Sequence, residues 1–157
     1  MKFYFGYLIS LAIVIFDQLS KWIAERYLLL HHPVPVMPSF NWTLMYNEGA
    51  AFSFLSDAGG WQRWFLSALS LIVSAIFVVW IYRLKNKQAG LSVALSLILG
   101  GAIGNLIDRI ATGRVVDFIQ WYYADYYWPA FNIADSAICV GAALLLISSF
   151  IEPPEKD

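Results

Sequence analysis

Four long apolar stretches of this sequence carry no charged side chain and no proline, and they constrain the fold more than any other feature. They run from residue 3 to 16, from 64 to 82, from 88 to 107 and from 136 to 151. A charge at the centre of a bilayer costs at least about 2.5 kcal/mol, and a helix needs roughly 20 apolar residues to cross it. The second and third stretches are long enough to cross, whereas the first and fourth must draw on their flanks.

The composition supports a membrane protein. Only 13% of the 157 residues are charged, where soluble domains have about a quarter, and 60% are hydrophobic. We therefore expect an all-α polytopic membrane protein, a single domain over residues 1–157 with four transmembrane helices. A net charge of -1 gives no basic surface for a nucleic-acid partner. The expected spans cover approximately residues 3–22, 64–82, 88–107 and 131–151.

The distribution of cations predicts an orientation. The segment "RLKNK", residues 83–87, packs three cations into five residues, which favours a cytoplasmic location for this loop and for both termini. The connections 17–63 and 108–135 are then outside. In the first, "HHPVPVMPSF" and the alternating "NWTLMYN" predict a small extracytoplasmic β element of one or two short strands. In the second, the aromatic cluster within residues 121–128 predicts an interfacial segment along the outer surface.

The sequence lacks the residues that several catalytic mechanisms require. The two histidines, His31 and His32, are adjacent in a loop and cannot both face one metal ion, so we expect no metal site. Ser136 has no histidine or lysine in its segment to act as a base. Cys139 lies in an apolar run and is interpreted as a small buried hydrophobe. No cofactor is expected.

The third apolar stretch ends in polar residues that packing alone does not require. Gly100 and Gly104 have the spacing that lets two helices approach closely. Asn105 and Asp108 follow, three residues apart and therefore on one helix face, and Arg109 comes next. Polar groups at membrane depth usually face a partner or a water-filled cavity, so these three are candidate functional residues.

Two further carboxylates flank the aromatic cluster. Asp117 precedes it and Asp135 follows it, and Asn132 shares a helix face with Asp135 if the last helix begins near residue 131. Two carboxyl groups brought together can share one proton, so that one activates a water as a base while the other acts as an acid. That chemistry suits peptide hydrolysis.

Two other classes of function remain open at this point. A small ion-coupled transporter would use intramembrane carboxylates to bind protons or cations, but such proteins commonly contain inverted repeats and sites at the bilayer midplane. No repeat is visible here, and the carboxylates fall at the ends of spans. A non-catalytic assembly subunit would explain the glycines and leave the carboxylates without a role.

Five blocks of the sequence resemble the lipoprotein signal peptidase (signal peptidase II) family. They are, in order, "DQLSK", "YNEGAAFS", "GGAIGNLIDR", "GRVVDF" and "FNIADS", and together they extend over nearly the whole chain. The resemblance implies a four-helix enzyme of the bacterial cytoplasmic (inner) membrane that needs no cofactor. It implies that the partners are membrane lipid and a diacylglyceryl-modified prolipoprotein, which the enzyme cleaves before the lipidated cysteine.

The resemblance also implies roles for individual residues. Asp117 and Asp135 match the catalytic pair, which would lie near the outer leaflet. Asp17 and Lys21, with i, i+4 spacing, are expected to form a structural ion pair. Asp125 matches no block and is interpreted as a solvated interfacial charge, and the aromatic segment could cover the site. The residues expected to bind substrate or support the site are Asn47, Gly49, Asn105, Asp108, Arg109 and Asn132.

Overall fold

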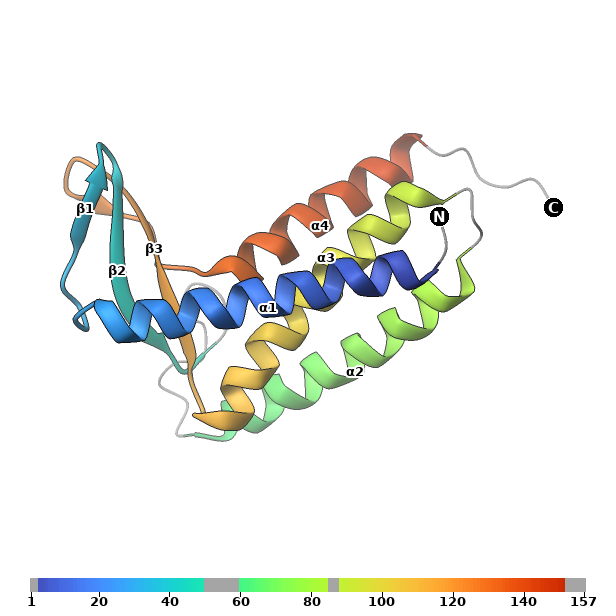
Figure 1. Ribbon diagram of the computed structural model, residues 1–157, viewed down its shortest axis with the longest axis horizontal. Coiled ribbons are helices and arrows are strands. Elements are labelled where there is room, and N and C mark those ends of the chain that lie inside the picture. Colours follow the sequence, from blue (N-terminus) through green and yellow to red (C-terminus); the bar gives the residue numbers. More distant parts are fainter. Residues whose placement is uncertain (1–2, 50–59, 85–87, 152–157) are drawn as a thin grey trace.

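The structure is a computed structural model that describes residues 3–49, 60–84 and 88–151 (Figure 1). It is mostly helical. Three helices are long and apolar enough to cross a membrane, and the fourth has a shorter apolar stretch, as expected for a membrane protein. The helices in these ranges are α1 (Phe3–Tyr27), α2 (Trp61–Arg83), α3 (Ala89–Ala111) and α4 (Ile133–Ile151).

Helix α3 is the centre of the bundle, because α1, α2 and α4 all pack against it. Small residues permit this close packing. A Cβ atom added at Gly100 would lie 2.8 Å from the carbonyl oxygen of Ser10 in α1, and one added at Gly104 would lie 2.6 Å from Oδ2 of Asp17. The GxxxG spacing marks a close approach of two helices, as the sequence predicted, and the structure shows that the partner helix is α1. The outer faces of α1 and α2 carry many exposed large apolar side chains, which suits contact with lipid.

A four-stranded antiparallel sheet lies at the end of the bundle opposite to the N-terminus (Figure 1). Its strands, in spatial order, are β1 (Val34–Met37), β2 (Phe40–Asn47), β3 (Val115–Tyr123) and β4 (Tyr126–Tyr127). The first two confirm the short strands predicted before the second helix. The other two were not predicted: most of the aromatic cluster lies in β3 and β4, whose backbones pair with each other.

The sheet is fixed to the bundle by a small apolar core and by the segment that leads into α4. Leu44, Val116 and Phe118 are buried against Ala24 near the end of α1. The carbonyl of Phe131 accepts hydrogen bonds from the backbone N–H groups of residues 118 and 119, at 3.1 and 2.9 Å. These contacts place the middle of β3 beside the start of α4, and so bring together two regions that carry candidate aspartates.

The α3–α4 interface provides a test of the packing. A Cβ atom at Gly141 would lie 2.7 Å from the carbonyl oxygen of Ala94, which is backbone and cannot move aside. We expect Gly141→Ala to lower the free energy of unfolding by about 1–3 kcal/mol. Gly90→Ala is the control, since nothing lies within 4 Å of its Cβ position. Thermal unfolding in one detergent compares the two variants, and equal melting temperatures would contradict this packing.

Candidate active site

Asp117 of β3 and Asp135 in the first turn of α4 are joined by the side chain of Asn132. Asn132 is fully buried, and its Nδ2 donates to Oδ1 of Asp117 at 2.8 Å. Its Oδ1 accepts from the backbone N–H of Asp135 at 2.8 Å, while Oδ2 of Asp135 accepts from the Asn132 N–H at 3.3 Å. This reciprocal pair is a capping box, with Asn132 as the N-cap of α4. The capping box therefore fixes the position of the Asp135 carboxylate, and the Asn132 side chain donates a hydrogen bond to the Asp117 carboxylate.

Each carboxylate also accepts a hydrogen bond from an asparagine on another element. Nδ2 of Asn47, at the end of β2, donates to Oδ2 of Asp117 at 3.3 Å, and Nδ2 of Asn105 in α3 donates to Oδ1 of Asp135 at 2.8 Å. The Gly49 N–H donates to Oδ1 of Asn47 at 2.9 Å, which orients this amide. Three elements of secondary structure besides α4 thus contribute directly to the site.

The expected pair of Asp17 and Lys21 is present, and it is part of a larger buried network. Nζ of Lys21 lies 2.8 Å from Oδ2 of Asp17 and 2.8 Å from Oδ2 of Asp108, and it donates to Oδ1 of Asn105 at 3.0 Å. All four residues are buried. Because the oxygen of Asn105 accepts from the ammonium, its amide nitrogen is left to face Asp135.

The two carboxylates of this network also accept hydrogen bonds from backbone groups of α4 and β3. Oδ1 of Asp17 accepts from the Ala134 N–H at 2.9 Å, at the positive end of the α4 dipole. Oδ2 of Asp108 accepts from the Val116 N–H at 3.2 Å, next to Asp117. Asp17 and Asp108 therefore position α4 and β3 respectively, and Asp108 does not line the cavity described below.

Sequence reasoning missed two residues that support the site. Nε2 of Gln18 donates to Oδ1 of Asp108 at 2.8 Å and to the carbonyl of Gly104 at 3.2 Å. Arg63 donates to the carbonyls of Arg109 and Ile110 at 2.8 and 2.7 Å, which caps the C-terminal end of α3. Gln18 lies inside the block "DQLSK", but no spacing rule distinguishes it. Arg63 directly precedes the uncharged stretch 64–82, and its contact with α3 depends on tertiary structure.

A cavity of about 590 Å³ opens beside the two aspartates. Asp135 lines it, whereas Asp117 is only 3% exposed and lies behind. The guanidinium of Arg109 also lines the cavity, and its Nη2 donates to the carbonyl of Gly49 at 3.1 Å. The other polar lining residues include Asn47 and Asn105. The walls are mainly apolar and come from α2, α3, α4 and residues 128–131.

The expectations for Cys139, for the aromatic cluster and for Asp125 can be compared with the structure around this cavity. Cys139 was interpreted as a buried hydrophobe, and this is wrong: it is exposed and lines the cavity one helical turn after Asp135. Of the aromatic cluster, Trp128 reaches the lining, while the remainder belongs to the β3–β4 hairpin. Asp125 is exposed in the turn of that hairpin. In the part of the chain that the structure describes, no cluster of three metal-ligating side chains is found.

The electrostatics of the site favour a shared proton. Burial raises the pKa of Asp117 to about 7, and the charge of Asp135 raises it further, against the opposing effect of the hydrogen bonds from Asn47 and Asn132. One proton is therefore retained by the pair up to neutral pH. Two carboxyl groups that share one proton offer both a base and an acid.

The chain is similar to known proteins over most of its length. The family model described as signal peptidase (SPase) II matches residues 9–151. A lipoprotein signal peptidase of Acinetobacter baumannii is 58% identical over 142 residues, which cover 90% of this chain and 81% of the relative. One from Cellvibrio japonicus is 50% identical over 158 residues and covers 99% and 92%.

The fold agrees as well. A bacterial membrane enzyme solved by the in meso method at 2.3 Å resolution superposes with a TM-score of 0.81 at 33% identity, covering 97% of this chain and 93% of that one. A second such structure, at 1.9 Å resolution, also gives 0.81 at 34% identity. The family match, the level of identity and the shared fold extend over nearly the same residues. The chain therefore belongs to the signal peptidase II family.

Proposed function

We propose that this protein is an aspartic endopeptidase of the bacterial inner membrane that removes the signal peptide from diacylglyceryl-modified prolipoproteins. Family membership and the high identity to lipoprotein signal peptidases support the cleavage of prolipoprotein signal peptides. The observation that carries the catalytic assignment is the pair Asp117 and Asp135, bridged by Asn132 beside the cavity. An ion-coupled transporter, the alternative considered from the sequence, is not supported by these comparisons.

The pair supplies the two proton transfers of amide hydrolysis. The ionised carboxylate takes a proton from a water while the water oxygen attacks the scissile carbonyl carbon, and the protonated partner donates its proton to the carbonyl oxygen. The carboxyl group that took the water proton then donates it to the nitrogen as the C–N bond breaks, and the other carboxylate takes back a proton from a hydroxyl of the tetrahedral intermediate as the new C=O forms. The pair returns to its singly protonated form, so neither proton nor charge is lost over a cycle.

The neighbouring polar groups bind and orient the scissile segment. The guanidinium of Arg109 faces the cavity and carries donors for main-chain carbonyl groups of the substrate. The amides of Asn47 and Asn105 keep the two carboxylates in place, since each donates to one of them. Cleavage immediately before the lipidated cysteine requires the acyl chains to remain in lipid beside the apolar lining, which fixes the depth of the scissile bond.

A second part of the proposal concerns the orientation of the protein in the membrane. We propose that all four helices cross, with both termini cytoplasmic and the active site near the outer leaflet. The start of α1 and the end of α4 lie at the same end of the bundle, and the sheet lies at the other (Figure 1). Helix α2 ends at this same end of the bundle with Arg83, the first cation of the "RLKNK" segment, which favours the cytoplasm there. Residues 85–87 of this segment lie outside the described ranges.

Replacement of either aspartate tests the mechanism. Asp117→Asn and Asp135→Asn keep the size and a polar amide, but neither can exchange the proton, so each should reduce precursor cleavage by roughly 10² to 10⁴ or more. Because the two groups act together, the double variant should be scarcely worse than either single one. The measurement is cleavage of a lipid-modified precursor by purified variants, with thermal melting to confirm folding.

Asp125→Asn is the matched control, because this carboxylate lies in the same connection but is exposed in the hairpin turn. It should retain wild-type activity. Near-normal turnover by Asp117→Asn or Asp135→Asn would remove that residue from the mechanism and the aspartic assignment with it.

The raised pKa of Asp117 predicts an effect of pH on both activity and stability. Cleavage should fall as the pH rises through about 7, where the pair loses its shared proton. The folded state also binds this proton more tightly than the unfolded chain, whose aspartates have a pKa near the ordinary 3.8. The contribution of Asp117 to the free energy of unfolding therefore decreases between pH 3.8 and about 7.

Asp117→Asn removes that titration. Between about pH 5 and pH 8 the melting temperature of the wild type should decrease more than that of Asp117→Asn, because only the wild type must ionise a buried carboxyl group. Parallel melting curves for the two proteins across this range would show that Asp117 does not titrate there.

The lipid requirement tests the proposed substrate. If the acyl chains position the scissile bond, loss of the diacylglyceryl group should lower kcat/KM strongly even when the peptide sequence is unchanged. Matched precursors with and without the lipid are compared at equal concentration in the same detergent. Equal cleavage of the two would contradict a lipid-dependent site.

A further inference from the structure

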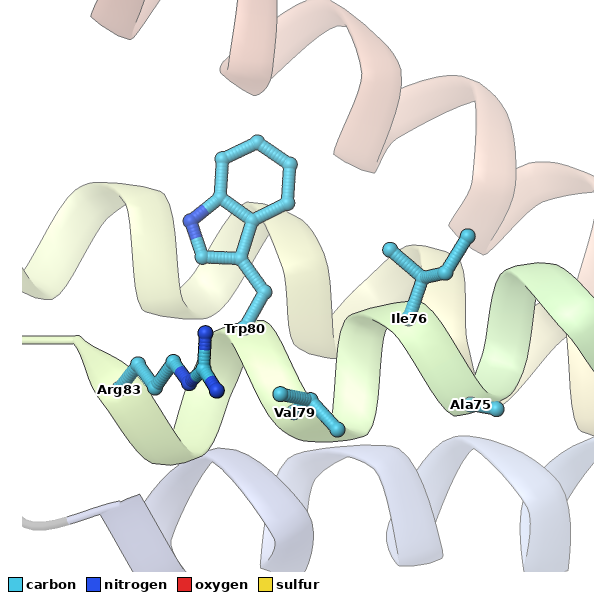
Figure 2. A pocket seen from close by; sticks show the side chains of 5 residues that line it. All are labelled: Ala75, Ile76, Val79, Trp80 and Arg83. Carbon is cyan, nitrogen blue, oxygen red and sulfur yellow. The ribbon is translucent and has the colours of Figure 1, made fainter.

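A second hollow lies on α2, at the end of the helix far from the catalytic aspartates. It is a groove of about 520 Å³ lined by Ala75, Ile76, Val79, Trp80 and Arg83. In Figure 2 the Trp80 and Ile76 side chains project from the same side of α2, and the guanidinium of Arg83 turns back along the helix toward them. The groove thus has apolar walls and a cation at one end.

Arg83 differs from the other charged residues of the described ranges. It is the only one of them in the half of the bundle where α1 begins and α4 ends; the rest lie from residue 17 of α1 to the sheet end. Within those ranges the guanidinium forms no salt bridge or hydrogen bond. The described part of the protein therefore supplies no anion to this group.

The position of Arg83 relative to a bilayer indicates which anion is available. Arg63 and Arg83 bracket the uncharged part of α2. Twenty residues of α helix rise about 30 Å, which is close to the thickness of the hydrocarbon core. When α2 crosses the membrane, Arg83 lies at the level of the lipid headgroups, where phosphodiester groups are the abundant anions. Trp80, one turn earlier, is a residue type enriched at that level.

We propose that this groove binds one membrane phospholipid with an anionic headgroup. An acyl chain lies along Ala75, Ile76 and Val79, and the phosphate accepts hydrogen bonds from the Arg83 guanidinium and the indole N–H of Trp80. The indole nitrogen lies on the edge of the ring toward the end of the helix that carries Arg83 (Figure 2). An ammonium-bearing headgroup would place a second cation near the guanidinium, so phosphatidylglycerol should be preferred to phosphatidylcholine.

The site is separate from the catalytic cavity, and the test does not use activity. Purified protein in a neutral detergent is titrated with phosphatidylglycerol or phosphatidylcholine of identical acyl chains, and native mass spectrometry counts bound lipids. We expect one phosphatidylglycerol to bind about tenfold more tightly than phosphatidylcholine. Arg83→Gln should abolish this preference, and Trp80→Phe, which keeps an aromatic ring but lacks the N–H, should weaken phosphatidylglycerol binding about fivefold.

Two control variants decide whether the groove or any surface cation is responsible. Arg26→Gln removes an exposed cation from the last turn of α1, at the sheet end of the bundle, and should leave the preference unchanged. Arg83→Lys keeps the charge and should retain most of it. The proposal is overturned if Arg83→Gln still prefers phosphatidylglycerol as the wild type does, or if Arg26→Gln loses the preference equally. Melting without added lipid confirms that the variants are folded.

Discussion

The contacts of the Lys21 ammonium group, buried among Asp17, Asp108 and Asn105, are the interactions on which the arrangement of the candidate site depends. An unpaired charge at this depth would be very costly, and removal of one partner from a buried pair typically costs about 3–5 kcal/mol. The two carboxylates in turn hold the Ala134 N–H of α4 and, through Asp108, the start of β3. One buried cation thereby connects α1, α3, α4 and the sheet.

The network explains how aspartates in one small region acquire different properties. Asp17 and Asp108 each form a buried salt bridge with the ammonium of Lys21, at 2.8 Å. Asp117 and Asp135 instead receive hydrogen bonds from neutral amides, chiefly those of asparagines on other elements. Burial beside a second carboxylate then favours one shared proton. In the proposed mechanism Asp17 and Asp108 hold α4 and β3 in position. Asp117 and Asp135 share the proton and carry out the chemistry.

Local pattern predicted the helices well and the sheet only in part. The uncharged stretch 64–82 lies inside α2 at Trp61–Arg83, because a membrane tolerates few charges within a span. Helix α1 continues to Tyr27, past the expected end near residue 22, because Ala24 packs against the sheet while the exposed side of the same turn carries Glu25 and Arg26. Strand β3 was missed because its partner β2 is about 70 residues away in sequence, and pairing over such a distance leaves little local signal.

The candidate site was also predicted only in part, because local spacing indicates contacts within one helix and not contacts between distant elements. Spacing placed Asn105 with Asp108 and Asn132 with Asp135, and all four lie in the observed network. Gln18 acts only through a contact with α3, which no spacing within one helix could show. The bridging role of Asn132 also depends on β3 reaching the start of α4, which is tertiary structure. Residues 50–53 of the block "YNEGAAFS" lie outside the described ranges.

The central claim is that Asp117 and Asp135 share one proton near neutral pH. Infrared difference spectroscopy observes it directly, because a protonated carboxyl group has a C=O stretch that an ionised one lacks. The account predicts a protonated-carboxyl band in the wild type that disappears as the pH rises through about 7, and the loss of this step in Asp117→Asn. A wild-type spectrum without any carboxyl titration between about pH 5 and pH 9, or an identical step in Asp117→Asn, would contradict it.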